Sequence, residues 1–119
     1  MPSLTTLVGA ATAAYSAVLV AAPRLLISAC GLEDSPGTRT LTRSVGARDV
    51  GLGLAMVLAP AGTARRVVVG ARALADLSDA AVFGAGATGR VRRVLVAGSA
   101  AGWGAVVVLA GVLDERAGR

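Results

Sequence analysis

Two long stretches without a single charged residue limit what this chain can fold into. They cover residues 4–22 and 94–113 of a 119-residue sequence. About 20 apolar residues, at a rise of about 1.5 Å each, are what an α-helix needs to cross a hydrocarbon core about 30 Å thick. A soluble protein of this length would have to bury both stretches on every side. We therefore predict an all-α integral membrane protein.

The composition agrees with this prediction and argues against a nucleic-acid partner. Hydrophobic residues make up 55% of the chain and charged residues 16%, whereas a soluble domain carries about a quarter charged residues. The net charge is +5. Its Arg residues fall in short clusters between apolar runs, with neither a basic stripe nor interleaved aromatics for base stacking. We expect no nucleic-acid binding.

A cleaved signal peptide is the rival interpretation of residues 4–22. Val20-Ala21-Ala22 resembles the small-residue motif that signal peptidases cut. The preceding residues, however, lack the basic n-region of a signal peptide, and Pro23 would hinder cleavage directly after the motif. We favour an uncleaved membrane helix.

Two further apolar runs complete the predicted architecture, a single-domain four-transmembrane-helix bundle with short loops. The expected helices cover about residues 4–22, 41–59, 66–85 and 94–113, and the stretch 25–29 is a candidate short interfacial helix. A turn around Pro60 separates the second helix from the third, so we expect these two to be antiparallel neighbours. Polar turns separate the others.

Arginines in the short loops predict the orientation, because such residues favour the cytoplasmic side. Six lie in or beside the first and third loops and four on the other side, which favours a multi-pass cell-membrane protein with both termini outside. The six are Arg24, Arg39, Arg43, Arg90, Arg92 and Arg93, and the four are Arg65, Arg66, Arg116 and Arg119.

Charged residues inside the second and third helices are the unusual feature of this sequence. Each costs at least about 2.5 to 3.5 kcal/mol at the bilayer centre, so partners are needed. Arg48 lies at nearly the same distance from the turn as Asp76, about 15 Å, and should face Asp76 or Asp79. Three residues of each sign form the predicted buried network: Arg43, Arg48, Asp49, Arg72, Asp76 and Asp79.

This network admits three interpretations. It can be architectural, holding the second helix to the third, because an unpaired charge in lipid is worse than a paired one. It can be a functional polar site, such as a proton or ion relay or a cavity for a polar small molecule. It can also form a protein–protein contact. We favour the architectural interpretation.

Small residues predict where the helices pack closely. Helix-packing positions are expected around the charged pair of the second helix and at a GxxxG pattern in the fourth. The pattern more readily marks packing inside the bundle than a dimer seam. The positions are Gly46, Gly51, Gly53, Gly98 and Gly102.

Several motifs resemble catalytic or cofactor sites but lack the context. Residues 84–89 match GxGxxG, yet the remaining chain cannot supply the rest of a dinucleotide-binding unit, so a Gly-rich loop is favoured. Asp76 and Asp79 suggest paired Mg²⁺ ligands, but nearby arginines make ion pairing simpler. Histidine is absent and Cys30 stands alone, which excludes a disulfide framework or zinc site within one chain. We expect no cofactor, metal or catalytic residue.

Residues 46–53, Gly-Ala-Arg-Asp-Val-Gly-Leu-Gly, followed by Arg72-Ala73-Leu74-Ala75-Asp76, carry a resemblance to a known family. Together with Pro23 and Gly31-Leu32, this pattern resembles an uncharacterised domain-of-unknown-function family of small four-helix integral membrane proteins. The resemblance implies the fold and carries no activity.

The expected function is that of a non-enzymatic structural or binding protein in the lipid bilayer. The alternative is a small transporter or proton- or ion-coupled subunit acting as an oligomer, and a lipid-modifying enzyme is a third hypothesis. A homo-oligomer and an unidentified small-molecule ligand are the partners we consider.

Overall fold

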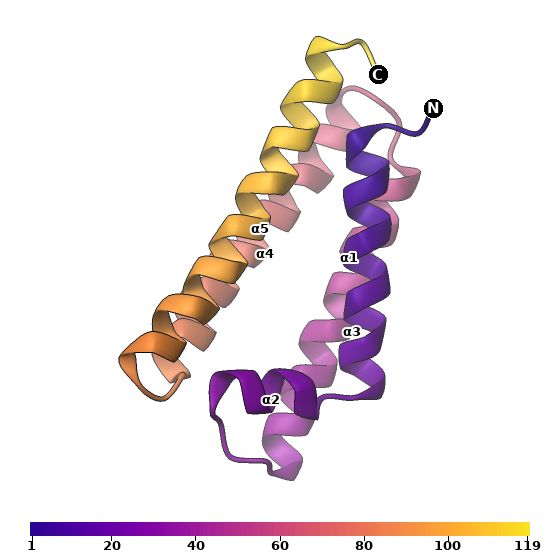
Figure 1. Cartoon of the computed structure of the whole chain (residues 1–119). Helices are drawn as coiled ribbons and strands as arrows, with labels where there is room; N and C mark the ends of the chain where they lie inside the picture. The colour runs from indigo at the N-terminus through magenta and orange to yellow at the C-terminus, as the bar shows by residue number, and fades with distance from the viewer.

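The computed structural model describes residues 1–119 and consists of five α-helices with no strand. The all-helical prediction is confirmed. Figure 1 shows both termini and the α3–α4 turn at one end of the molecule, with α2 and the α4–α5 turn at the other. The helices are α1 (Leu4–Ala21), α2 (Arg24–Cys30), α3 (Pro36–Leu58), α4 (Thr63–Gly86) and α5 (Arg90–Arg116).

The later helices extend beyond the predicted apolar runs. At the start of α3, the Ser35 hydroxyl accepts from the Thr38 backbone N–H at 3.1 Å, and the Thr38 hydroxyl accepts from the Ser35 N–H at 2.9 Å. This capping box, with Pro36 at the first helical position, starts α3 five residues before the predicted residue 41. The prediction placed the helix ends at the limits of the apolar runs, so it did not include these polar terminal turns. The candidate helix at 25–29 is present as α2.

The closest packing joins α1 to α3 and α4 to α5. Glycine makes the first of these contacts possible. A Cβ added at Gly53 would lie 2.6 Å from the Ala13 backbone nitrogen, and one at Gly9 would lie 2.8 Å from the Gly53 carbonyl oxygen. Gly46 approaches the Ser16 carbonyl of α1 in the same way, at 3.1 Å. The two backbones therefore touch along a glycine-lined seam.

The two helices expected to be antiparallel neighbours, α3 and α4, are in contact but loosely packed. The two helices are antiparallel, but their backbones make few contacts compared with the α1–α3 and α4–α5 pairs. The glycine face of α3 is turned to α1, and the side of α3 that faces α4 carries long charged side chains. These side chains, described below, bridge the wider gap.

The predicted packing glycines divide into two groups. Gly46 and Gly53 lie in the α1–α3 seam, whereas nothing lies within 4 Å of a Cβ added at Gly51, Gly98 or Gly102. The GxxxG pair therefore does not pack inside the bundle. The α4–α5 contact instead uses glycines that lack this spacing, Gly84, Gly104 and Gly111. In a helix this rich in glycine, small residues occur on several faces, so the motif does not identify the packed one.

Polar side chains make up a large part of the buried residues, and many large aliphatic side chains are exposed. Polar residues such as Thr12, Thr42 and Asp49 are buried, while large aliphatic side chains such as Leu58 and Val67 are 79% and 64% exposed. On length and composition, α1 and α5 are the two helices able to cross a membrane.

Asp114 near the end of α5 caps the start of α1. Its carboxylate accepts hydrogen bonds from the Leu4 N–H at 2.9 Å and from the Thr5 N–H and hydroxyl, both at 2.7 Å. The residue is fully buried. A negative side chain at a helix N-terminus satisfies otherwise unpaired N–H groups, so Asp114 ties the first helix to the last.

Candidate functional site

Five charged side chains form one continuous ion-pair network between α3 and α4. Negative and positive groups alternate in the order Asp79, Arg48, Asp49, Arg72 and Asp76. The nitrogen–oxygen distances are 2.7 Å from Arg48 to Asp79, 2.8 Å from Arg48 to Asp49 and 2.9 Å from Arg72 to Asp49. Arg72 also donates to both carboxylate oxygens of Asp76.

Helical periodicity places these groups. Arg72 and Asp76 are four residues apart on α4, so their side chains meet on one face of that helix. Asp79 follows Asp76 by three residues and shares the face. Arg48 reaches across from α3 to Asp79, while Arg72 reaches from α4 back to Asp49. Two crossing ion pairs therefore join the two helices.

The middle of the network is buried and its Asp79 end is more open. Arg72, Asp76 and Asp49 are 1%, 2% and 3% exposed. The side chains of Arg48 and Asp79 are 37% and 17% exposed. Because buried charges need complete pairing, the buried half of the network is where a lost partner has the largest effect.

Arg43, expected in this network, lies outside it. Its side chain is exposed and donates to the Val20 carbonyl of α1 at 3.3 Å. Five residues before Arg48, it is rotated by about 140° around α3 and points to another neighbour. The network consequently holds two Arg and three Asp, one negative charge in excess, instead of the balanced count that the sequence suggested.

Two aromatic residues that the sequence analysis did not select join the network to α1 and α5. The Tyr15 hydroxyl accepts from Arg72 at 3.2 Å, and Tyr15 packs edge-to-face on Trp103 with ring centroids 5.9 Å apart. The Trp103 indole N–H donates to the Thr12 hydroxyl at 3.0 Å. Each lies in the middle of a charge-free run. Because Tyr and Trp usually lie at a membrane interface, this position is the signal that the sequence offers for them.

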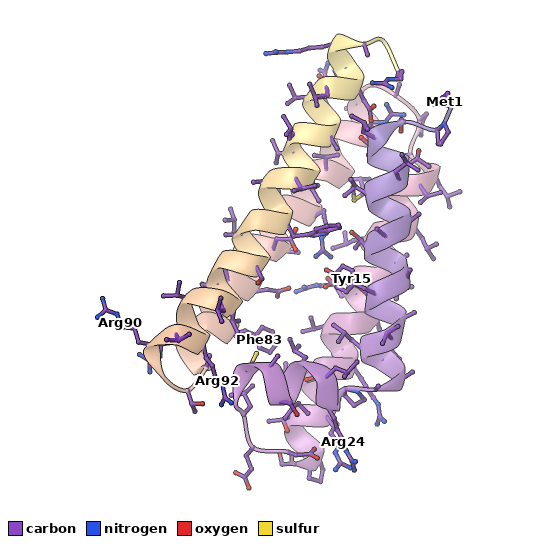
Figure 2. All side chains as sticks on the ribbon, in the orientation of Figure 1. Met1, Tyr15, Arg24, Phe83, Arg90 and Arg92 are labelled. Carbon is purple, nitrogen blue, oxygen red and sulfur yellow. The ribbon has the colours of Figure 1, made fainter.

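A cavity of about 500 Å³ opens beside this network, between the α1–α3 pair and the α4–α5 pair. Ten of its fifteen lining residues are hydrophobic. Asp49, Arg72, Asp76 and Asp79 provide its charged wall. Figure 2 shows Tyr15 pointing from α1 into the space between the two helix pairs.

Helix α2 lies across one end of this space (Figure 1). Cys30 of α2 packs on Phe83 of α4 and on Ala87, the residue directly after α4, and the Thr88 N–H donates to the Cys30 carbonyl at 3.2 Å. Burial raises the pKa of the Cys30 thiol, which keeps it neutral. Cys30 is thus a small apolar packing residue, and α2 anchors the two helix pairs to each other at this end.

No family model, curated protein or solved structure matches this chain. The site combines a mostly apolar chamber with a few convergent charged groups, which is the usual composition of a small-molecule pocket. Such a site can bind and orient a ligand. Asp76 and Asp79, considered as Mg²⁺ ligands in the sequence, are each engaged by an arginine.

Proposed function

We propose that this chain is a multi-pass membrane protein whose helices α1, α3, α4 and α5 all cross the bilayer. The exposure of many large aliphatic side chains supports this proposal, because such side chains on the outside match lipid, whereas water would not favour them. The arrangement of polar groups supports it too. Charged groups inside a membrane are expected to pair with one another in the interior of a bundle, and the charged residues of α3 and α4 pair across the two helices.

Cysteine labelling distinguishes four crossings from the two that α1 and α5 alone would make. In a Cys30→Ala background, single cysteines replace Glu33, Ala61 and Arg90, three exposed residues in or beside the connections. Four crossings with both termini outside expose only Ala61→Cys to a membrane-impermeant maleimide on intact cells.

Two crossings would place all three positions on one side, so equal labelling of the three would overturn the proposal. Protection of Ala61→Cys with labelling of the other two would keep four crossings and reverse the orientation. Labelling after detergent solubilisation controls for accessibility of each cysteine.

The activity we propose is non-enzymatic binding of a small molecule in the central cavity. The observation that carries it is the cavity of about 500 Å³ between the two helix pairs, whose lining combines ten hydrophobic residues with four residues of the charged network. Of these four, Asp79 is the most accessible, with 17% of its side chain exposed.

Filling the cavity tests this function. Ala100 lines the cavity, while its neighbour Ala101 lines a second, separate cavity formed by α4 and α5 without charged residues. Ala100→Phe should abolish ligand-induced thermal stabilisation of the detergent-purified protein in a screen of small amines, acids and neutral compounds. Ala101→Phe adds the same volume and should keep it. Stabilisation that is equal in both variants would place binding elsewhere.

The second candidate is an oligomeric proton- or ion-coupled transporter, favoured by the excess carboxylate in the network. Proteoliposomes would then show ligand flux that requires Asp79, with Asp79→Asn folded and inactive. Flux unchanged by this substitution, or ligand binding without any flux, would reject the transporter and favour the binding protein.

A further inference from the structure

We propose that the start of α5 binds the phosphate groups of anionic phospholipids at one surface of the membrane. The site is a group of three exposed arginines, Arg90, Arg92 and Arg93, called here the arginine cluster. The inference rests on the crossing of the bilayer by α5 and goes beyond the proposed binding function. Three observations carry it: the lack of carboxylate partners, the position of the guanidinium groups and the apolar surface that follows them.

No member of the arginine cluster forms a salt bridge. Two carboxylates lie in the α2–α3 connection, at the same end of the molecule. Asp34 is engaged by Arg39 at 2.6 Å and by Arg24 at 3.4 Å, and Glu33 forms no salt bridge. Positive charge at this end is therefore left without a partner in the protein, and an anion is what complements it.

The opposite end of the molecule differs, because two of its arginines have carboxylate partners. Arg66 pairs with Glu115 at 2.6 Å, and Arg119 approaches Asp114 at 3.6 Å. The unpaired positive charge is thus concentrated at the end that holds α2 and the α4–α5 turn (Figure 1).

Local hydrogen bonds hold two of the guanidinium groups on the α4–α5 turn. Arg92 Nη1 donates to the Thr88 hydroxyl at 3.1 Å, and Arg93 Nε donates to the Ala87 carbonyl at 3.1 Å. A guanidinium has five N–H donors in a planar fork, so each of the two keeps further donors that suit phosphate oxygens. Arg90 points away from the rest of the molecule (Figure 2). The cluster therefore presents three cationic groups to the outside.

The surface of α5 among and after the arginine cluster is apolar. Val91, Val94 and Leu95 are 72%, 65% and 62% exposed. The cluster lies directly before the charge-free run of α5, and in a bilayer crossed by α5 this border is at the level of the lipid headgroups. A phospholipid can place its phosphate on the arginines and its acyl chains along these aliphatic side chains, whereas inorganic phosphate gains only the first contact.

Three ligands test the proposal on the full chain in a neutral detergent, with binding measured by native mass spectrometry. Dioctanoyl phosphatidylglycerol carries a net negative charge, dioctanoyl phosphatidylcholine has the same chains and no net charge, and inorganic phosphate has no chains. We expect phosphatidylglycerol to bind at least about tenfold more tightly than phosphatidylcholine. Inorganic phosphate at the same concentration should not displace it.

Substitutions at the two ends of the molecule locate the site. Replacing the whole arginine cluster by Gln should reduce the affinity for phosphatidylglycerol to that for phosphatidylcholine. Arg66→Gln, Arg116→Gln and Arg119→Gln, combined in one protein, make the same charge change at the opposite end and should alter the affinity by less than about twofold. Arg90→Gln alone leaves the hydrogen bonds of the α4–α5 turn intact, and should weaken binding about fivefold in a folded protein, as circular dichroism can verify.

Each contrary result overturns the inference. Equal binding of the two phospholipids would remove the role of the headgroup charge. An equal loss of affinity in the variant of the opposite end would show attraction to the net charge of the protein in place of a site. Displacement by inorganic phosphate would identify a site for free phosphate. Cysteine labelling tests the membrane crossing independently, so a failure of lipid binding would leave the proposed topology standing.

Discussion

The guanidinium of Arg48 on α3 lies 2.7 Å from the carboxylate of Asp79 on α4. This contact joins two helices whose backbones approach each other much less than either approaches its other neighbour. The α3–α4 relationship is therefore maintained by side-chain charge, and the α1–α3 relationship by backbone packing. The two kinds of contact respond differently to substitution.

The Arg48–Asp79 pair should show energetic coupling. Arg48→Ala and Asp79→Ala should each lower the thermal stability of the protein in detergent. The double variant should lose less than the sum of the two, with a coupling of about 0.5 to 3 kcal/mol. Additive losses in this double-mutant cycle would argue against direct pairing.

Arg72 should be the most sensitive arginine in the chain. Arg72→Ala leaves Asp76 buried without a partner and Asp49 with Arg48 alone, so we expect a loss of about 3 to 5 kcal/mol in unfolding free energy. Arg43→Ala is the matched control. Arg43 is exposed on the surface of α3, so its replacement should change the unfolding free energy by about 0.5 kcal/mol or less. Comparable losses, measured by denaturant titration in micelles, would contradict the network as described.

Glycine-to-alanine substitutions should separate the packed face of α3 from its open face. A methyl group at Gly53 would meet the α1 backbone at 2.6 Å and force the two helices apart. Gly51→Ala meets nothing within 4 Å and should stabilise α3 by up to about 1 kcal/mol through helix propensity. The melting temperature should fall for Gly53→Ala and stay level or rise for Gly51→Ala. The reverse order would place the seam elsewhere.

Removing the Asp114 carboxylate should release the start of α1. Asp114→Ala leaves the Leu4 and Thr5 N–H groups without their acceptor and should cost about 1 to 3 kcal/mol. Amide hydrogen exchange should accelerate selectively in the first turn of α1. Glu115→Ala removes an exposed carboxylate one residue away and serves as the control. Unchanged exchange at Leu4 and Thr5 in Asp114→Ala would refute the cap.

Acid should release the Asp34–Arg39 pair in the α2–α3 connection. The hydrogen bond from Arg39 holds the pKa of Asp34 below its ordinary value. The stabilising effect is therefore present above the unfolded-state pKa of about 3.9 and is lost as the pH falls through the lower folded-state pKa. Carboxyl ¹³C shifts can follow this titration. In Arg39→Ala the midpoint should return toward about 3.9; an unchanged midpoint would refute the pairing.

The sequence was informative where a single physical property decides the outcome. Charge-free runs located α1 and α5, and the depth of Arg48 below the α3–α4 turn brought it to the level of the α4 carboxylates. Arg43 was misplaced because counting charges ignored its angle around the helix. Hydropathy also could not predict which helices pack most closely, since it does not show that Gly9 and Gly53 face each other.

Other features were hidden because they depend on residues distant in the sequence. Asp114 looked like a polar flank of α5, and only the folded chain brings it to Leu4 and Thr5. Tyr15 and Trp103 stand out in the middle of the two charge-free runs, but only the packed structure shows that they contact each other. The cavity itself follows from the spread between two helix pairs, a property that no local pattern encodes.

The two ways of joining helices would leave opposite records among relatives of this protein. At Gly9 and Gly53 every side chain is excluded on steric grounds, so these positions should stay glycine and show no correlated change. A change of charge at position 48 alters its attraction to position 79, so these two positions should covary. Contacts inferred from correlated substitutions would then reveal α3 against α4 and miss the much tighter seam between α1 and α3.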